Sequence, residues 1–445
     1  MKNLLLGILL FSLFTLSSCS QKQDVQSSNS GAIEDIAVNL VTDFSKGEFD
    51  KAANEYSYTA EMKKIISAQF LQEQVWDPLT NSYGAFQSIN GTATTQAQEY
   101  DIISVKTAFE KAKLNLNIVF DKNKVIAGIN YTPDQDAAEK IPQGVKETEI
   151  KFGKKEWELP GTLTTSENTS KCPVVILVHG SGPNDRDETI LATKPFRDLA
   201  WGLAQKGIAT FRYDKRTFVY QEKLATTDLE AFTVEEEVIE DALLAVEYAA
   251  TLKQIDSEKI YVLGHSLGGT LIPRIAEKAN KATGFIIMAG AVTPIEDLAV
   301  EQIEYISSLD GLTADDEKTI AAYEKMRSNI KQLTPNSQAK PSELFGTPAA
   351  YWLDLKAYQP AKIARNIKKP LLLLQGERDY QVPPRELQLW KKELSSKKNV
   401  QFVSYPNLNH LFVKGEGKST PQEYSLVGHV ENKVIEDIAN WIKQN

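Results

Sequence analysis

The sequence predicts two folded regions of different class: a small α+β domain over residues 31–135, and an α/β domain with a mostly parallel sheet over residues 148–445. The spacing of apolar residues carries this prediction, because near residue 148 it changes to short apolar runs separated by amphipathic stretches. The length of 445 residues also exceeds that of one small domain. With 42% hydrophobic and 24% charged residues, the composition is that of a globular protein and excludes a disordered or fibrous chain.

The charge balance argues against a nucleic-acid partner. Lysine and arginine number 50 against 59 acidic residues, and the basic residues form no stripe, so no nucleic-acid partner is expected. We interpret the net charge of −9 as a contribution to solubility.

The cysteines are Cys19 and Cys172; if Cys19 is modified, no internal disulfide can form and the core must stabilise the fold.

The first residues have the pattern of an export sequence. Lys2 precedes a short apolar run over residues 4–16, which is too short to span a bilayer as a permanent helix, so residues 1–18 are predicted to be a signal peptide. The sequence Leu-Ser-Ser-Cys that ends at Cys19 resembles the bacterial lipobox, which implies that Cys19 is lipidated and anchors an exported protein to a bacterial membrane, on its periplasmic or cell-surface side. The alternative is a plain signal peptide with an incidental cysteine. Residues 19–30, rich in Ser and Gln, are predicted to be a flexible tether.

Helix and strand patterns define the small domain over residues 31–135. Residues 32–49 place apolar side chains at helical spacing, whereas residues 114–120 and 125–131 alternate apolar and polar residues around a short polar turn. A helix packed on an antiparallel sheet gives a small α+β domain. Its scattered carboxylates form no catalytic pattern, and residues 133–142 are predicted to be a linker.

Short apolar runs and amphipathic stretches alternate after residue 148. Each run has the length of a strand buried on both faces, so the alternation predicts a parallel sheet covered by helices on both sides. The expected strands are residues 174–178, 208–211, 260–263, 285–289 and 371–374, and the expected helices are residues 195–205, 234–252 and 267–279.

One connection is far longer than a crossover helix requires. Residues 291–366 separate two of the expected strands. Helices are expected within them at residues 301–309 and 315–330, so we interpret this insertion as a helical lid. Its aromatic residues exceed what a solvated loop needs. We expect most of them to be packing residues and one or two to line a substrate pocket; they are Tyr305, Tyr323, Tyr351, Trp352 and Tyr358.

The stretch Gly264-His265-Ser266-Leu267-Gly268 carries the first chemical prediction. It joins an expected strand to an expected helix and has the pattern Gly-x-Ser-x-Gly, in which small residues permit a sharp turn that lifts the serine hydroxyl above the sheet. The serine then lies at a helix N-terminus, where backbone N–H groups favour negative charge. We therefore predict that Ser266 is a nucleophile.

The chain from about residue 148 to its end resembles the bacterial α/β-hydrolases related to serine aminopeptidases, dienelactone hydrolases and lid-bearing carboxylesterases. The resemblance rests on the Ser266 turn, on the His-Gly-Ser-Gly turn at residues 179–182, and on an acid and a histidine that follow later strands. It implies the α/β-hydrolase fold. The region over residues 31–135 resembles a domain of unknown function found ahead of bacterial hydrolases, with a cone shape like nuclear transport factor domains, and this likeness assigns no chemistry.

Two further stretches, residues 180–187 and 211–216, resemble exported esterases of the same group. Many relatives have a glycine after the second stretch, where this chain has Thr217. The roles of its charged residues therefore stay open between a structural ion network near the site and a contact with substrate; these residues are Arg212, Asp214 and Arg216.

The resemblance implies an oxyanion hole made of two backbone N–H groups. One comes from the loop after the strand at residues 174–178 and the other from the residue after the nucleophile. These positions are Ser181 and Leu267, with Gly182 as the alternative to Ser181.

The resemblance also implies which residues are the acid and the base of a catalytic triad with Ser266. Asp379 follows the strand at residues 371–374, and His410 follows the last strand, so the order Ser, Asp, His is the order of this fold. Each has a rival, because Glu377 lies two residues before Asp379 and His429 follows later in the chain.

The expected activity is hydrolysis of carboxylic esters through an acyl-enzyme, with a small-molecule ester as substrate and no metal or organic cofactor. A serine aminopeptidase or a thioesterase on the same scaffold is the alternative enzyme. The alternative of another class is a non-catalytic surface lipoprotein that binds a ligand. The sequence predicts neither the acyl nor the alcohol group, nor the oligomeric state.

Overall fold

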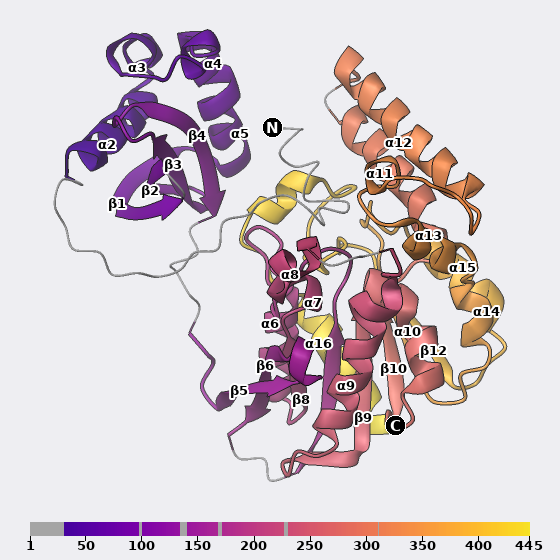
Figure 1. The fold of residues 1–445 in the computed structure, drawn as a ribbon. Coiled ribbons are helices and arrows are strands. Elements are labelled where there is room, and N and C mark those ends of the chain that lie inside the picture. The colour runs from indigo at the N-terminus through magenta and orange to yellow at the C-terminus, as the bar shows by residue number, and fades with distance from the viewer. Residues whose placement is uncertain (1–30, 98–99, 134–139, 168–170, 227–229, 310) are drawn as a thin grey trace. The chain divides into compact units, whose positions relative to one another are not determined.

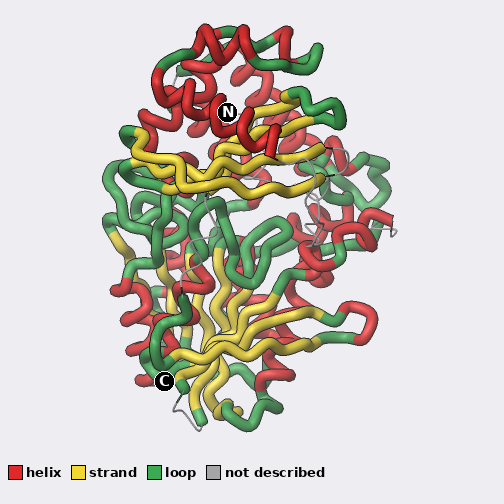
Figure 2. The backbone as a smooth tube through the Cα atoms, turned by 90° about the vertical axis from the view of Figure 1, so that its left-hand side faces the viewer, coloured by secondary structure: helices red, strands yellow, loops and turns green. Residues whose placement is uncertain are grey.

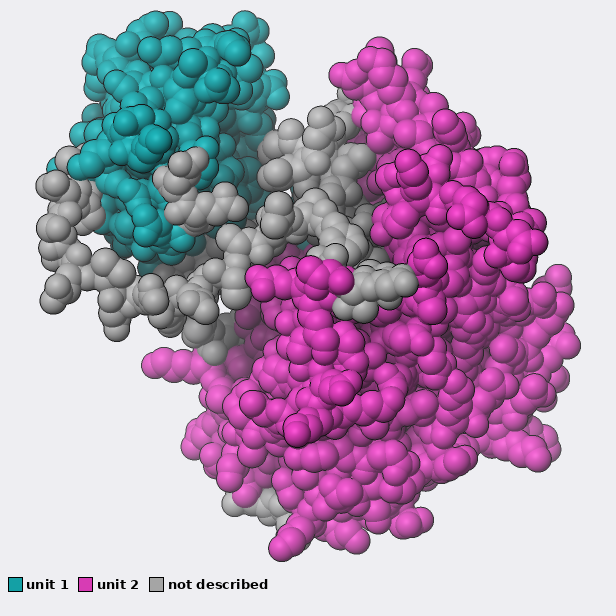
Figure 3. All heavy atoms as spheres, in the orientation of Figure 1, with its two compact units in different colours: residues 1, 16–139, 422–427 teal, residues 2–15, 140–421, 428–445 magenta. Residues whose placement is uncertain are grey.

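The computed structural model describes residues 31–97, 100–133, 140–167, 171–226, 230–309 and 311–445. The predicted signal peptide, the tether and Cys19 lie outside these residues, as does most of the predicted linker. The described residues divide into two compact units (Figure 3). Unit 1 holds residues up to 133 together with residues 422–427, and unit 2 holds residues 140–421 and 428–445. None of the helices described is long and apolar enough to cross a membrane.

Unit 1 is a four-stranded antiparallel sheet with helices over one face (Figures 1 and 2). The predicted hairpin is confirmed, because β3 pairs antiparallel with β4. The predicted helix over residues 32–49 is wrong at its end: Gly47 adopts a positive φ of 75° and divides it into two helices. The bounds are α2 Gly31–Lys46, α3 Phe49–Glu55, α4 Ala68–Phe70, η2 Leu71–Trp76, α5 Asp77–Tyr83, β1 Phe86–Ala97, β2 Tyr100–Phe109, β3 Lys113–Phe120 and β4 Ile126–Pro133.

Unit 2 contains an eight-stranded sheet in the order β12-β11-β10-β9-β7-β8-β6-β5. Strands β7 to β12 run parallel to one another, and antiparallel pairing is confined to one end of the strand order, where β6 pairs antiparallel with both β8 and β5. The predicted fold class, a mostly parallel sheet with a helical insertion, is confirmed. The strand bounds are β5 Val145–Phe152, β6 Leu159–Ser166, β7 Cys172–Val178, β8 Ala209–Tyr213, β9 Ile255–His265, β10 Gly284–Met288, β11 Leu371–Gly376 and β12 Val400–Tyr405.

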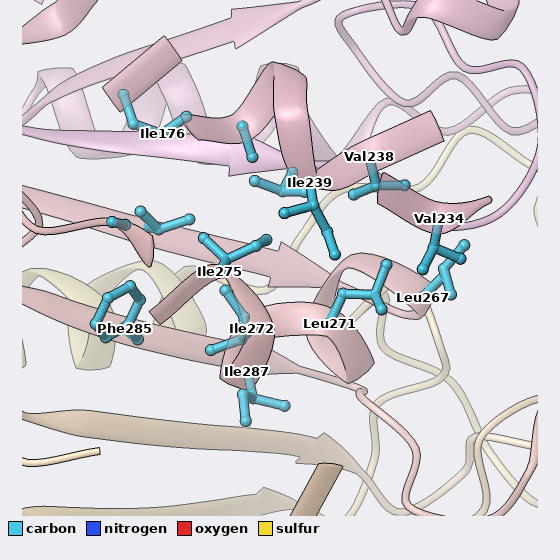
Figure 4. Packing of buried hydrophobic residues seen from close by; sticks show 14 of the residues in the cluster. Ile176, Val234, Val238, Ile239, Leu267, Leu271, Ile272, Ile275, Phe285 and Ile287 are labelled. Carbon is cyan, nitrogen blue, oxygen red and sulfur yellow. The ribbon is translucent and has the colours of Figure 1, made fainter. Parts of the chain in front are cut away.

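Helices cover both faces of this sheet because its central strands bury apolar side chains on both faces. Successive side chains of a strand point to opposite faces. In β7, Val174 and Ile176 pack in one core cluster with helices α9 and α10, whereas Val175 and Leu177 pack in the other with α6 and α16. Figure 4 shows the first of these clusters, in which α10 lies against β10. The helix bounds are α6 Pro195–Ala204, α7 Arg216–Val219, α8 Gln221–Thr226, η4 Glu235–Ile239, α9 Glu240–Ala249, α10 Leu267–Lys278, α15 Arg385–Leu394 and α16 Asn432–Gln444.

The insertion after β10 is helical, as predicted, and Figure 1 shows its longest helices beyond the end of the sheet. Its first helix begins six residues earlier than the predicted start at Glu301, since α11 begins at Ile295. The second, α12, begins at a capping box formed by Thr313 and Asp316. The bounds are α11 Ile295–Ser308, α12 Ala314–Gln332, α13 Ala349–Lys356 and α14 Pro360–Ala364.

Candidate active site

Ser266 lies at a strained turn between β9 and α10. Its backbone has φ 52° and ψ −117°, a conformation that costs a non-glycine residue about 1–3 kcal/mol and persists only where neighbouring structure enforces it. The Ser266 N–H donates to the carbonyl of Met288 at the end of β10, at 2.9 Å. Because α10 begins at Leu267, the first amides of this helix have no partner within the helix. The turn therefore presents a partly exposed hydroxyl beside free backbone donors.

Glycines make this turn possible by letting backbones approach closely. A Cβ on Gly268 would lie 2.4 Å from the carbonyl oxygen of Val178, at the end of β7. A Cβ on Gly264 would lie 2.3 Å from the carbonyl oxygen of Gly268 itself. Neither position can hold a side chain without moving the backbone. The Gly-x-Ser-x-Gly pattern is thus a packing requirement of the β9–α10 turn.

Asp379 and His410 meet at the ends of β11 and β12. Their side chains are buried, and Nδ1 of His410 lies 2.7 Å from Oδ2 of Asp379. The other carboxylate oxygen, Oδ1, accepts the backbone N–H groups of Gln381 and Val382 at 2.8 and 2.9 Å. The carboxylate is therefore fixed in orientation, and it holds the proton of His410 on Nδ1. The Nε2 atom is left as an acceptor, which is the state a general base requires.

The two rival residues lie elsewhere. Glu377 is exposed and accepts a hydrogen bond from Ser404 at 2.8 Å. The side chain of His429 is 51% exposed, and its Nδ1 lies 3.2 Å from Asp198. The structure brings neither of them to Ser266, Asp379 or His410.

The loop after β7 passes directly beside Ser266. A Cβ on Gly180 would lie 3.1 Å from Cβ and 3.6 Å from Oγ of Ser266. The carbonyl oxygens of Gly180, Ser181 and Gly182 all accept from the side-chain amide of Asn184, at 3.3, 3.0 and 3.2 Å. Ser181 thus follows a glycine that lies beside Ser266, which is the position expected for an oxyanion donor if Ser266 is the nucleophile.

A buried ion pair lies under the site. Glu188 Oε2 is 2.9 Å from Nδ1 of His265, the residue before Ser266. Burial opposes charge on both groups, but their mutual attraction outweighs it, so that the pKa of His265 is raised and the pKa of Glu188 is lowered. The Nε2 atom of His265 donates to the backbone carbonyl of His410 at 3.0 Å. Both ring nitrogens therefore face acceptors, as in an imidazolium.

The charged residues that the sequence left open form ion pairs. The Arg212 guanidinium, almost fully buried, contacts Glu147 and Asp187. Asp214 binds Arg186 through two parallel bonds of 3.0 and 2.9 Å, and the equally buried Arg216 binds Asp241 at 2.5 Å. This pattern favours the structural interpretation of these residues over a contact with substrate.

The lid aromatics divide into two groups. The most buried ones hold the lid through their polar atoms: Tyr351 donates to Glu237 at 2.7 Å, and Trp352 and Tyr358 donate to backbone carbonyls. Tyr305 is different, because its ring lies 5.3 Å from that of Tyr380, next to Asp379. Tyr305 is therefore the lid aromatic that the structure places at the acid-bearing turn.

Sequence reasoning missed Glu188 and Lys215 as residues of this site. Lys215 is buried, and its ammonium group donates to the carbonyls of Gly180 and Gly182 at 2.8 and 3.0 Å. Both residues lie in or next to the two charged stretches singled out in the sequence, but burial of a charge becomes visible only in the fold. Within the described parts of the chain, no group of three His, Cys, Asp or Glu side chains has the arrangement of a metal site.

Chemically, the site combines a hydroxyl on a strained turn, a histidine held by a buried carboxylate, and backbone donors from two loops. These are the parts that acyl transfer needs: a nucleophile, a base whose tautomer is fixed, and stabilisation of an oxyanion.

Comparisons with known proteins agree with this chemistry. Residues 231–432 match the Prolyl oligopeptidase family, and residues 37–129 match a protein family of unknown function, DUF3887. Esterase EstD of Thermotoga maritima is 38% identical over 417 residues, which cover 93% of this chain and 96% of that protein.

Solved structures with similarity to this chain include Est1E from Butyrivibrio proteoclasticus, at 18% identity and a TM-score of 0.43, over 67% of this chain and 99% of that one. Another is the acylaminoacyl peptidase of Pyrococcus horikoshii, at 19% identity and a TM-score of 0.45, over 80% of this chain and 49% of that one.

Proposed function

The chain belongs to the α/β-hydrolase family that includes esterase EstD, and from this membership we propose that it hydrolyses small-molecule carboxylic esters through an acyl-enzyme on Ser266. The observation that carries the assignment of residues is the buried contact of 2.7 Å between His410 Nδ1 and Asp379, at the carboxyl ends of the parallel strands, where the Ser266 turn also lies.

Acylation begins when Nε2 of His410 takes the proton of the Ser266 hydroxyl. The serine oxygen attacks the ester carbonyl, and the carbonyl oxygen becomes an oxyanion that the N–H groups of Ser181 and Leu267 stabilise. The imidazolium then gives its proton to the alkoxide, the bond from carbonyl carbon to alkoxide oxygen breaks, and the alcohol leaves. Asp379 keeps the imidazole in the correct tautomer and stabilises its charged form.

Deacylation repeats these steps with water as the nucleophile. His410 takes a proton from water, the hydroxide attacks the acyl carbon, and the serine oxygen leaves with the proton returned by the imidazolium. The products are a carboxylic acid and regenerated enzyme. Apart from the ester and water, the proposed steps use side chains and backbone groups of this chain.

A labelling experiment tests the proposal. A fluorophosphonate should label the protein on Ser266, and Ser266→Ala should abolish both labelling and the cleavage of p-nitrophenyl esters. Labelling at full rate in the Ser266→Ala variant would refute the assignment of the nucleophile. A wild-type protein that neither reacts nor cleaves any ester would favour the ligand-binding alternative.

Peptidase activity is the second candidate, because residues 231–432 match the Prolyl oligopeptidase family. Ester and amide substrates pass through the same tetrahedral oxyanion, so the site geometry serves both. A panel of p-nitrophenyl esters and aminoacyl-nitroanilides separates them: we expect kcat/KM for the best ester to exceed that for any anilide. Thioesters in the same panel test the thioesterase alternative.

We also propose that the protein is exported and carries lipid on Cys19. The support is the Leu-Ser-Ser-Cys sequence after an apolar run, in a part of the chain outside the described residues. Cys19→Ala should release the protein from bacterial membranes without changing kcat on a soluble ester. Retention of the variant in the membrane fraction to the same extent would refute the lipid anchor.

A further inference from the structure

We infer that Lys215 is a positioning residue of the oxyanion hole, which fixes and polarises the Ser181 N–H by binding the carbonyl group of the same peptide unit. The inference deepens the proposed function and rests on it, because it assigns a role in stabilising the oxyanion of that reaction.

The carbonyl groups of residues 180–182, in the loop after β7, are all bound by the side chains of Lys215 and Asn184. Those of Gly180 and Gly182 accept from the Lys215 ammonium, at 2.8 and 3.0 Å, and those of residues 180–182 accept from the Asn184 amide. A trans peptide unit is planar, with its C=O and N–H pointing in opposite directions, and none of the described peptide bonds is cis. The Ser181 N–H must therefore point away from Lys215. A Cβ built on Gly180 would lie 3.1 Å from Cβ of Ser266, so the loop meets the proposed site of reaction at this residue, and we place the Ser181 N–H on that side.

The ammonium group has all of its donors in use. Its third contact is with Oε1 of Glu237, at 2.5 Å, and both side chains are buried. An ammonium has three N–H donors, and two carbonyls and one carboxylate satisfy them. Lys215 is thus held in one orientation and can hold the loop in one orientation in turn.

The charge of Lys215 acts on the same peptide unit. A cation bound to a carbonyl oxygen draws electron density from the amide, and its N–H becomes a stronger donor because hydrogen bonds in a chain polarise one another. On the other side of Gly180, the N–H of that residue donates to Glu188 at 2.7 Å. A buried cation and a buried anion therefore clamp the residue that precedes the oxyanion donor.

The ion pair between Lys215 and Glu237 is also connected to the lid. Oε2 of Glu237 accepts from the hydroxyl of Tyr351 in α13, at 2.7 Å, and this hydroxyl is buried. The chain of contacts runs from the lid through Glu237 and Lys215 to the oxyanion loop, so the packing of α13 and the orientation of the loop depend on one another.

Comparison of an ester with its thionoester tests the inference. The thionoester places sulfur, a weaker hydrogen-bond acceptor, where the oxyanion forms, so it gains less from the oxyanion hole. The variant is Lys215→Met combined with Glu237→Gln, because the double change leaves no lone buried charge. We expect kcat/KM for the ester to fall by about tenfold to a hundredfold. We expect the loss for the thionoester to be at least about fivefold smaller, so that the ratio of the two rates falls.

The matched control is Arg216→Met combined with Asp241→Asn. It removes another buried ion pair, which lies next in the sequence but does not bind the loop carbonyls. Its ester-to-thionoester ratio should equal that of the wild type, whatever the change in stability. Circular dichroism and Tm show which variants fold. If the Lys215→Met variant does not, Lys215→Gln with Glu237→Gln keeps a donor without the charge, and its rate ratio decides in the same way.

Equal losses for ester and thionoester, or an unchanged ester rate, would overturn the inference. A fluorophosphonate gives a readout that needs no ester turnover, because its phosphoryl oxygen also occupies the oxyanion hole as Ser266 is modified. The second-order labelling rate of the Lys215 variant should fall by at least about tenfold. A protein that labels on Ser266 but cleaves no ester would refute the proposed substrate, while the labelling rates would still decide the role of Lys215.

Discussion

The carboxylate of Glu188 lies 2.9 Å from the imidazole of His265, and this buried pair connects three loops of the site. Glu188 also accepts the N–H of Gly180 in the oxyanion loop, at 2.7 Å, and His265 donates to the backbone carbonyl of His410, at 3.0 Å. His265 itself precedes Ser266. This one ion pair therefore helps to fix the relative positions of Ser266, His410 and the loop at Gly180, although it touches none of the atoms that we propose to react.

Glu188→Gln should lower both stability and rate. The amide retains the shape of the side chain but removes the charge that balances His265, and breaking one partner of a buried pair costs about 3–5 kcal/mol. We expect a loss of this order in the free energy of unfolding, and a fall in kcat of about tenfold as the loops lose their common anchor. Urea denaturation and steady-state kinetics measure the two effects.

The control for this variant is Glu377→Gln, which changes an exposed carboxylate that directly follows β11. It should change the free energy of unfolding by less than about 0.5 kcal/mol. A Glu188→Gln protein as stable and active as this control would show that the buried pair has no positioning role.

The same pair predicts a stability that depends on pH. Glu188 has a folded pKa below its ordinary value of 4.5, so its contribution is present above pH 4.5 and is lost as the pH falls through the folded pKa. His265 has a folded pKa above its ordinary value of 6.5, so its contribution is complete below pH 6.5 and is lost as the pH rises through the folded pKa. Both contributions are complete between these two values.

The measurement is the difference in unfolding free energy between the wild type and the double variant Glu188→Gln/His265→Gln, taken from pH 3 to pH 9. The difference should be greatest between about pH 4.5 and 6.5 and decline on either side. A difference that is constant over this range would mean that the two side chains do not form an ion pair in the folded protein.

Glycine at position 268 should be indispensable for a different reason. A Cβ there would lie 2.4 Å from the Val178 carbonyl oxygen and 2.6 Å from that of His179, and both are backbone atoms that cannot rotate away. Gly268→Ala should therefore force β7 and α10 apart, at a cost of about 1–3 kcal/mol or more, and reduce ester hydrolysis to below about 1% of the wild-type rate.

Gly128→Ala is the matched control, since a Cβ there meets only the side chain of Val119 at 3.6 Å, an ordinary contact. Its kcat should be that of the wild type. Thermal denaturation and ester hydrolysis compare the two alanine variants, and a Gly268→Ala enzyme with full activity would contradict the packing argument.

The sequence was informative where one local pattern determines the structure. The central strands were predictable because they are apolar on both faces, and the Ser266 turn because glycines must flank it. The edge strand β5 was not, since it reads Val-Lys-Glu-Thr-Glu-Ile-Lys-Phe and has few apolar residues to mark it. Strand β1 escaped prediction in unit 1 because most of its residues are small and polar.

The candidate site divides in the same way. Asp379 and His410 could be named because each follows a strand end in the chain order of the fold. The roles of Glu188, His265 and Lys215 could not, because their meaning lies in burial and in partners distant in the sequence; Lys215, for example, binds a carbonyl 35 residues away. A lysine in a polar stretch is normally exposed, and only the folded chain shows that this one is not.

The lid predicts a change in substrate preference at Tyr305. This side chain lies on α11, its hydroxyl donates to the carbonyl of Ser419 at 3.0 Å, and its ring faces Tyr380 beside the acid. Tyr305→Ala should shift the relative kcat/KM among p-nitrophenyl esters of different acyl length, because it removes an aromatic ring next to the turn that carries Asp379. Tyr323→Ala is the control, since that ring packs on Phe345 within the lid and should leave the chain-length profile unchanged. Identical profiles in both variants would mean that Tyr305 does not shape the pocket.

The assignment of acid and base gives the sharpest kinetic prediction. Asp379→Asn preserves the shape of the side chain, but the new amide can donate a hydrogen bond to Nδ1 of His410. The imidazole would then be held in the wrong tautomer, and kcat should fall by on the order of 10³–10⁴. His410→Ala should lose at least as much, because it removes the base itself. His429→Ala and Glu377→Gln should each cost less than about tenfold, since one side chain is half exposed and the other binds Ser404 at the surface. Steady-state kinetics on one ester, with circular dichroism to establish folding, compares the four variants. A fully active His410→Ala enzyme, or a folded His429→Ala enzyme without activity, would require a different base.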